Sequence, residues 1–117
     1  MSFMGNIKGR MALAKQGKGD VEGAKKLYEE ALAAGMDSAQ YMLAYSVLLL
    51  RDGEYEKAKG VLVKTQKAPG LNDAQRQQVF MNYAVACYKL GDLNRAVELL
   101  EKQHQRNLVY HRRGNQK

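Results

Sequence analysis

The sequence contains one cysteine, one proline and no tryptophan among its 117 residues. Because the single thiol of Cys87 has no internal partner, a disulfide-stabilised scaffold is excluded, and the composition fits a reducing compartment. No apolar run approaches the roughly 18 residues of a membrane-spanning helix. Residues 1–10 also lack the apolar stretch of a secretory signal peptide. We therefore expect a cytoplasmic protein with no membrane span.

Acidic residues are missing from both ends of the chain. Residues 1–19 carry four basic side chains and no acid, and residues 102–117 carry five basic side chains and no acid. The remaining stretch holds ten basic and twelve acidic residues, so the net charge of +7 belongs to the ends. A nucleic-acid groove needs lysine and arginine along one face of the folded body, with aromatic or base-reading side chains between them. The sequence therefore predicts no specific nucleic-acid site.

Residue clusters that could support catalysis or bind a metal are also missing. His104 and His111 stand seven positions apart, without cysteines or carboxylates at ligand spacing beside them. Cys87 falls at a core position of its segment, which favours packing over nucleophilic chemistry. We predict that the protein is not an enzyme and has no cofactor or metal.

The chain does contain one pattern that is repeated three times. Each copy has a segment of apolar residues at helical spacing, a turn with glycine followed by an acidic residue, and a second such segment. The turn glycines are Gly19, Gly53 and Gly91, which lie 34 and 38 residues apart. The repeats therefore predict three helical hairpins in succession.

Caps and apolar spacing place six helices in these hairpins. The expected ranges are 2–16, 21–34, 39–51, 55–66, a fifth helix from a cap at Asn72 or Asp73 to Leu90, and 93–105. The four extra residues of the third copy are expected to lengthen its first helix at the N-terminal end. Residues 108–117 are expected to form a short basic C-terminal tail.

Helical spacing also predicts which side chains form the core. In the first helix Phe3, Ile7, Met11 and Ala14 make one apolar stripe. The third helix has no polar face, so it is expected to be buried all round or to cover an occupied surface. Small residues recur at equivalent positions where helices cross closely: Ala12, Ser46 and Ala84 on the first helices, and Ala24, Ala58 and Ala96 on the second. Larger residues recur in the neighbouring layer: Met11, Tyr45 and Tyr83 on one side, and Tyr28, Leu62 and Leu100 on the other.

The period of 34 residues, the glycine and acid at each hairpin turn, the small residues at the crossings and the alanine five residues after each turn glycine resemble the tetratricopeptide repeat. The resemblance covers residues 6–105 and is loosest in the first copy, where Lys8 replaces the family's aromatic residue. Met42 and Phe80 stand at that position in the other copies, and Pro69 only approximates the usual closing proline. The resemblance implies an all-α fold, a right-handed α-solenoid of three helix-turn-helix hairpins. One repeat domain would span residues 1–107, with repeats at about 5–38, 39–72 and 73–107.

The resemblance also implies where a partner binds. In this family the first helices line a concave groove, which here comprises Asn6, Arg10, Leu13, Gln40, Leu43, Ala44, Val47, Gln78, Met81, Asn82 and Val85. The family's clamp for chaperone C-terminal carboxylates uses cations, but its positions hold Gly9, Leu13, Ala44, Gln78 and Asn82 in this sequence. Without a carboxylate clamp, a mostly apolar groove with a few amides suits an amphipathic helix or an extended apolar peptide. We therefore expect a scaffold that binds a protein or peptide.

Two alternatives rest on the same features. No helix is expected to cover the last hairpin, so Val97, Leu99 or Tyr88 is expected to be exposed. The chain would then self-associate as a homo-oligomer, through this uncapped end or through the apolar surface around Leu43 and Val47. Alternatively, the chain is a piece of a longer repeat array.

Overall fold

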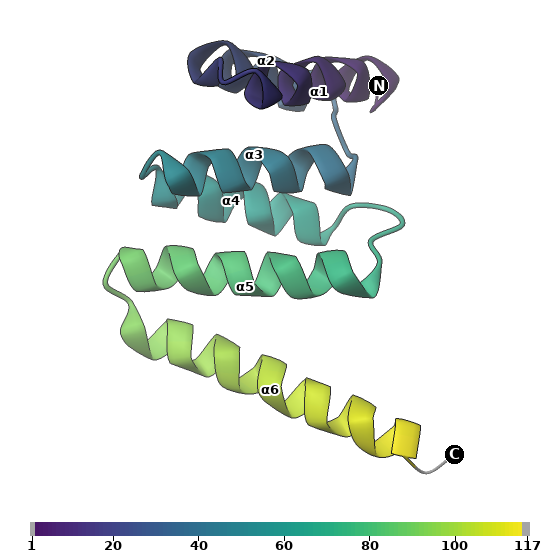
Figure 1. The fold of residues 1–117 in the computed structure, drawn as a ribbon, viewed down its shortest axis with the longest axis vertical. Coiled ribbons are helices and arrows are strands. Elements are labelled where there is room, and N and C mark those ends of the chain that lie inside the picture. Colours follow the sequence, from purple (N-terminus) through teal and green to yellow (C-terminus); the bar gives the residue numbers. More distant parts are fainter. Residues whose placement is uncertain (1, 116–117) are drawn as a thin grey trace.

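The computed structural model describes the backbone of residues 2–115 and the side chains of residues 2–106. The helices of this part are α1 (Ser2–Gly17), α2 (Val21–Ala33), α3 (Ala39–Arg51), α4 (Tyr55–Gln66), α5 (Asp73–Lys89) and α6 (Leu93–Asn115). Consecutive helices pair as the hairpins α1–α2, α3–α4 and α5–α6, which stack along the long axis of the molecule (Figure 1). The fold is therefore an all-α helical-repeat solenoid, as the sequence predicted.

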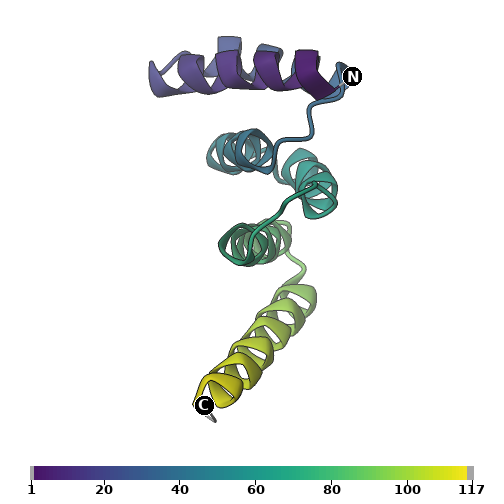
Figure 2. The same ribbon diagram turned by 90° about the vertical axis from the view of Figure 1, so that its right-hand side faces the viewer.

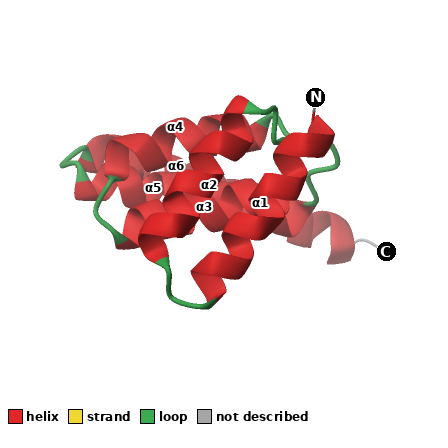
Figure 3. Ribbon diagram, turned by 90° about the horizontal axis from the view of Figure 1, so that it is seen from above, coloured by secondary structure: helices red, strands yellow, loops and turns green. Residues whose placement is uncertain are grey.

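Consecutive hairpins use the same pairs of helices to pack against one another. The first helices form a row, with α1 against α3 and α3 against α5. Each second helix also touches the first helix of the next hairpin, α2 against α3 and α4 against α5. In Figure 2, α1 lies across the view whereas α3, α4 and α5 are seen nearly end-on. Seen from above in Figure 3, the first hairpin crosses the helices beneath it, so the hairpins rotate about the stacking axis.

Most helices begin and end where the sequence predicts, because capping residues and turn glycines fix their ends. The side chain of Asn72 accepts the N–H of Gln75 at 2.7 Å, and the side chain of Gln75 accepts the N–H of Asn72 at 3.0 Å. This capping box satisfies two N–H groups that would otherwise lack helical partners at the start of α5. Gly53 and Gly91 have φ values of 78° and 87°, a left-handed conformation that favours glycine and closes the second and third hairpins.

The expected end of the sixth helix at Gln105 is wrong. Helix α6 continues to Asn115, so the expected basic tail is helical up to that residue. The reason is that no proline interrupts residues 106–115, and polar composition alone does not end a helix. Residues 116 and 117 lie outside the described residues.

The predicted packing between helices is confirmed at most positions. Met11 and Leu100, expected in the layer of larger residues, are the exceptions: both are exposed, because they lie on the outer helices of the stack. All six small residues at the predicted crossings are buried: Ala12, Ser46, Ala84, Ala24, Ala58 and Ala96. The rings of Tyr28 and Tyr45 stack with centroids 4.7 Å apart and planes 17° apart, which joins α2 to α3. Cys87 is buried in the core, the packing role that its position predicts.

The predicted core stripe of α1 is wrong. Phe3, Ile7, Met11 and Ala14 are all exposed, Phe3 at 70% and Met11 at 52%. The buried residues of this helix are Gly5, Gly9 and Ala12, on its opposite side. Helix α1 therefore packs through its small residues, and its large apolar side chains face away from the stack.

Candidate binding surface

Most of the predicted groove residues lie on three neighbouring helices and keep accessible surface. They are Arg10 and Leu13 on α1, Gln40, Ala44 and Val47 on α3, and Gln78, Met81, Asn82 and Val85 on α5. Because α3 contacts both α1 and α5, these nine residues belong to adjacent elements. We call them the inner surface; that it forms a concave groove stays a prediction.

Two predicted groove residues have other roles in the structure. Leu43 is only 6% exposed and packs with Leu62 and Val79 in a core cluster between α3, α4 and α5. The amide nitrogen of Asn6 donates to Asp37 Oδ1 at 3.0 Å, and its oxygen accepts the N–H groups of Asp37 and Ser38, each at 3.1 Å. Leu43 is therefore a core residue, and Asn6 ties α1 to the segment before α3.

The inner surface is apolar with a few amides and one charge. Met81 and Val85 are 43% and 42% exposed on α5, and Arg10 is the single charged residue among the nine. Within the described side chains, Nδ2 of Asn82 is buried without a hydrogen-bond partner. An unpaired buried donor costs free energy.

A hydrogen-bonded chain behind the inner surface fixes α1 relative to α3. The hydroxyl of Tyr28 donates to Oε1 of Gln16 at 2.6 Å, and Nε2 of Gln16 donates to the carbonyl of Ala44 at 3.4 Å. Burial raises the pKa of the Tyr28 hydroxyl, so this group stays protonated and remains a donor. The network links α2, α1 and α3 directly beneath Ala44.

Sequence reasoning was also incomplete at the last hairpin. Tyr88 lies one turn beyond Val85 and extends the exposed apolar stripe of α5, although it is absent from the predicted groove. Its spacing of seven residues from Met81 was the available signal. The expectation that Val97, Leu99 or Tyr88 is exposed is confirmed by Val97 and Tyr88, whereas Leu99 is buried against Ala84 and Cys87. Leu99 therefore faces α5 and not the end of the stack.

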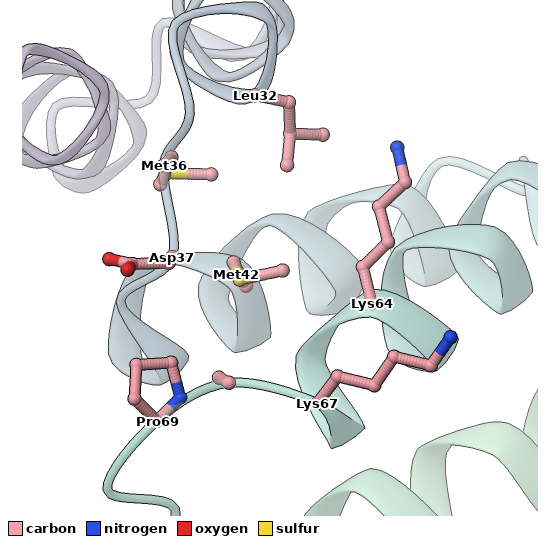
Figure 4. Close-up of a pocket in the computed structure, with 8 residues that line it drawn as sticks. Leu32, Met36, Asp37, Met42, Lys64, Lys67 and Pro69 are labelled. Carbon is pink, nitrogen blue, oxygen red and sulfur yellow. The ribbon is translucent and has the colours of Figure 1, made fainter. Parts of the chain in front are cut away.

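A separate hollow of about 320 Å³ opens between the first and second hairpins. Figure 4 shows Leu32, Met36 and Met42 around it, with Lys64 of α4 and Lys67, the residue after α4, at its rim. Met36 and Met42 are largely buried, so the hollow offers little apolar surface to a partner.

The described part of the chain shows no sign of a metal or membrane site. No three His, Cys, Asp or Glu side chains within it are grouped to hold a metal ion. None of its helices combines the length and the apolar character needed to cross a bilayer.

Comparison with known proteins then decides the family. The sequence matches the family model described as "Tetratrico peptide repeat" over residues 6–50 and 50–110, which include all three hairpins. The chain belongs to the tetratricopeptide repeat family. Proteins built from tetratricopeptide repeats are protein-interaction scaffolds and typically lack enzymatic activity, and the stacked hairpins described above agree with that architecture.

One relative is a much longer protein. The chain is 31% identical over 95 residues to a protein named "Methyltransferase" from Gibberella zeae. The aligned part covers 77% of this tetratricopeptide repeat chain and 13% of that protein. The chain thus spans about one-eighth of the length of this relative, and the name "Methyltransferase" describes that longer protein.

Proposed function

We propose that the inner surface binds an amphipathic helix or an extended apolar peptide of a partner protein, and that the chain has no catalytic role. The observation that carries the proposal is the row of Val47, Met81 and Val85 on α3 and α5, with the amides of Gln40 and Gln78 on the same two helices. Apolar contacts provide affinity for such a ligand, and a few amides orient its backbone.

The charge pattern supports an apolar ligand over a terminal carboxylate. The five positions that resemble the family's carboxylate clamp contain no lysine or arginine. One of them, Gly9, is buried in the contact between α1 and Met36 and Tyr41. A carboxylate placed there would be desolvated without a cation to pair with, which is unfavourable.

A peptide selection tests this proposal. Amphipathic helical and extended apolar peptides would be displayed as a library, selected against the wild-type chain, and their dissociation constants measured by fluorescence anisotropy. Val85→Glu places a charge in the apolar row, so we expect the selected peptides to bind at least about tenfold more weakly, equal to ~1.4 kcal/mol. Val47→Glu should act in the same direction, with circular dichroism as the check on folding because Val47 is half-buried.

Val63→Glu is the matched control. Val63 lies on α4 and is 42% exposed, the same fraction as Val85, but it is outside the inner surface. Glu29 and Glu101 occupy the corresponding positions of the other two hairpins, so the fold accepts glutamate there. Equal weakening by Val63→Glu and Val85→Glu, or a library without binders at ~100 μM (about 5.5 kcal/mol of binding free energy), would contradict the proposal.

A further inference from the structure

The two ends of the stack each expose an apolar face. Phe3, Ile7 and Met11 on the outer side of α1 form the N-terminal face, and α1 lies at the top of Figure 1. Met81 on α5 and Val97 and Leu100 on α6 form the C-terminal face, and α6 lies at the bottom. Each of these six side chains is at least 40% exposed. Large apolar surfaces of this kind mark interaction sites.

The repeat register relates these two faces to the two halves of an interface between consecutive hairpins. The contact between the second and third hairpins is centred on Leu43, Leu62 and Val79. The residues 38 positions after Leu43 and Leu62 are Met81 and Leu100, and the residue 72 positions before Val79 is Ile7. In the interface between the second and third hairpins, α3 and α4 contribute one side and α5 the other. The C-terminal face has the residues equivalent to the side of α3 and α4, and the N-terminal face has the residue equivalent to the side of α5.

The contact between the first and second hairpins gives the same result. There Tyr28 of α2 stacks on Tyr45 of α3. Their counterparts are Leu100, 72 positions after Tyr28, and Met11, 34 positions before Tyr45. Tyr28 and Tyr45 are fully buried by one another and their neighbours, whereas both counterparts are exposed. Both contacts between hairpins thus relate Leu100 of the C-terminal face to residues of the N-terminal face.

The C-terminal face also has a shallow hollow. It lies on α6 and is lined by Val97, Leu100, Glu101, His104 and Gln105.

We infer that a second copy of this chain stacks on the first head to tail, with the N-terminal face of one copy packed against the C-terminal face of the other. The contact continues the interface between the hairpins, with Ile7 of one copy between Met81 and Leu100 of the other. Because the two faces differ, the interface is heterologous, and each added copy presents a new free face. The assembly therefore grows with concentration and does not close at a dimer.

Complementary variants test the inference. Met11→Glu disables only the N-terminal face, and Leu100→Glu disables only the C-terminal face; both residues are exposed, so the fold is retained. Light scattering after size exclusion, from about 1 to 100 μM, should show a mass that rises without a fixed limit for the wild type and a monomer for each variant. An equimolar mixture of the two variants should give a one-to-one dimer and nothing larger, because one intact face of each kind remains.

Other outcomes overturn the inference. A wild-type monomer at every concentration would mean that the faces do not pair, and neighbouring repeats of a longer chain would then be their natural cover. A dimer of Met11→Glu alone, or a mixture that stays monomeric, would exclude the head-to-tail contact. Val63→Glu serves as the charge-matched control and should assemble like the wild type. Met81 belongs to both the inner surface and the C-terminal face. For this reason Met81 is not substituted in this test or in the peptide test.

Discussion

Gly5 and Gly9 lie where α1 meets the segment that connects α2 to α3. A Cβ added at Gly5 would lie 2.7 Å from the Cα of Met36 and 2.8 Å from the carbonyl oxygen of Ala31. A Cβ at Gly9 would meet the side chain of Met36, which is flexible and can move aside. The contacts at Gly5 involve backbone atoms, so an added methyl group is tolerated less well at Gly5 than at Gly9. This glycine, together with the hydrogen bonds of Asn6, fixes how α1 joins the stack.

Gly5→Ala is expected to destabilise the protein by about 1–3 kcal/mol, the usual cost of overpacking a tight contact. The matched change is Gly60→Ala on α4, where an added Cβ has no atom within 4 Å. That change should stabilise by about 0.4–1 kcal/mol, because alanine restricts the unfolded chain and favours the helix. Urea unfolding followed by circular dichroism measures both. A Gly5→Ala variant as stable as Gly60→Ala would show that α1 does not pack in this way.

Helix α2 is joined to the second hairpin by ion pairs as well as by the tyrosine stack. The ammonium of Lys25 contacts Asp52 and lies 2.7 Å from Glu54, both in the segment between α3 and α4. Lys57 of α4 pairs with Glu29 of α2. The hydrogen bond from Lys25 lowers the pKa of Glu54 below its usual value.

This shift predicts how stability depends on pH. Because the pKa of Glu54 is lower in the folded state, its stabilisation is complete above the usual value of 4.5 and is lost as the pH falls through the folded-state pKa. The free energy of unfolding should fall between pH 7 and pH 3, and Lys25→Met should make this fall smaller. The difference should be less than about 1 kcal/mol, because Glu54 is more than one-third exposed. Lys26→Met, at an exposed position of the same helix, is the control. Identical pH profiles for Lys25→Met and the wild type would contradict the assignment.

At the scale of the whole molecule, the hairpins could be predicted from sequence because their packing is local. The turn glycines and the alanines at positions 24, 58 and 96 recur in every copy; each glycine lies in the turn of its own hairpin, and each alanine is buried. The orientation of α1 could not be predicted from its apolar period, because Phe3, Ile7 and Met11 suit a contact with a preceding repeat as well as a contact within the chain. The glycines at positions 5 and 9, on the other side of the helix, were the sequence signal that distinguishes these two kinds of contact.

The surface was less predictable than the fold for a related reason. Leu43 and Val47 have similar places in the repeat pattern, but Leu43 is covered by α5 and α4 whereas Val47 keeps accessible surface. That difference depends on how consecutive hairpins rotate, which no single repeat encodes. Similarly, the use of Asn6 to hold Asp37 and Ser38 depends on the path of the chain between α2 and α3.

The methionines of this chain report separately on its surfaces. Met81 lies on the inner surface, Met4 and Met11 are exposed on α1, and Met36 and Met42 are buried between the first two hairpins. Their methyl groups therefore distinguish binding at the inner surface from binding at the N-terminal face.

The most direct test of the proposed binding surface is a titration of the ¹³C-methyl-methionine protein with a selected apolar peptide, followed by NMR. The Leu100→Glu variant is the protein to use, because its C-terminal face is disabled and stacking cannot contribute to the signal. We predict that the Met81 methyl resonance shifts with added peptide while those of Met4, Met11, Met36 and Met42 stay in place. A shift of Met4 or Met11 without a shift of Met81 would contradict binding at the inner surface.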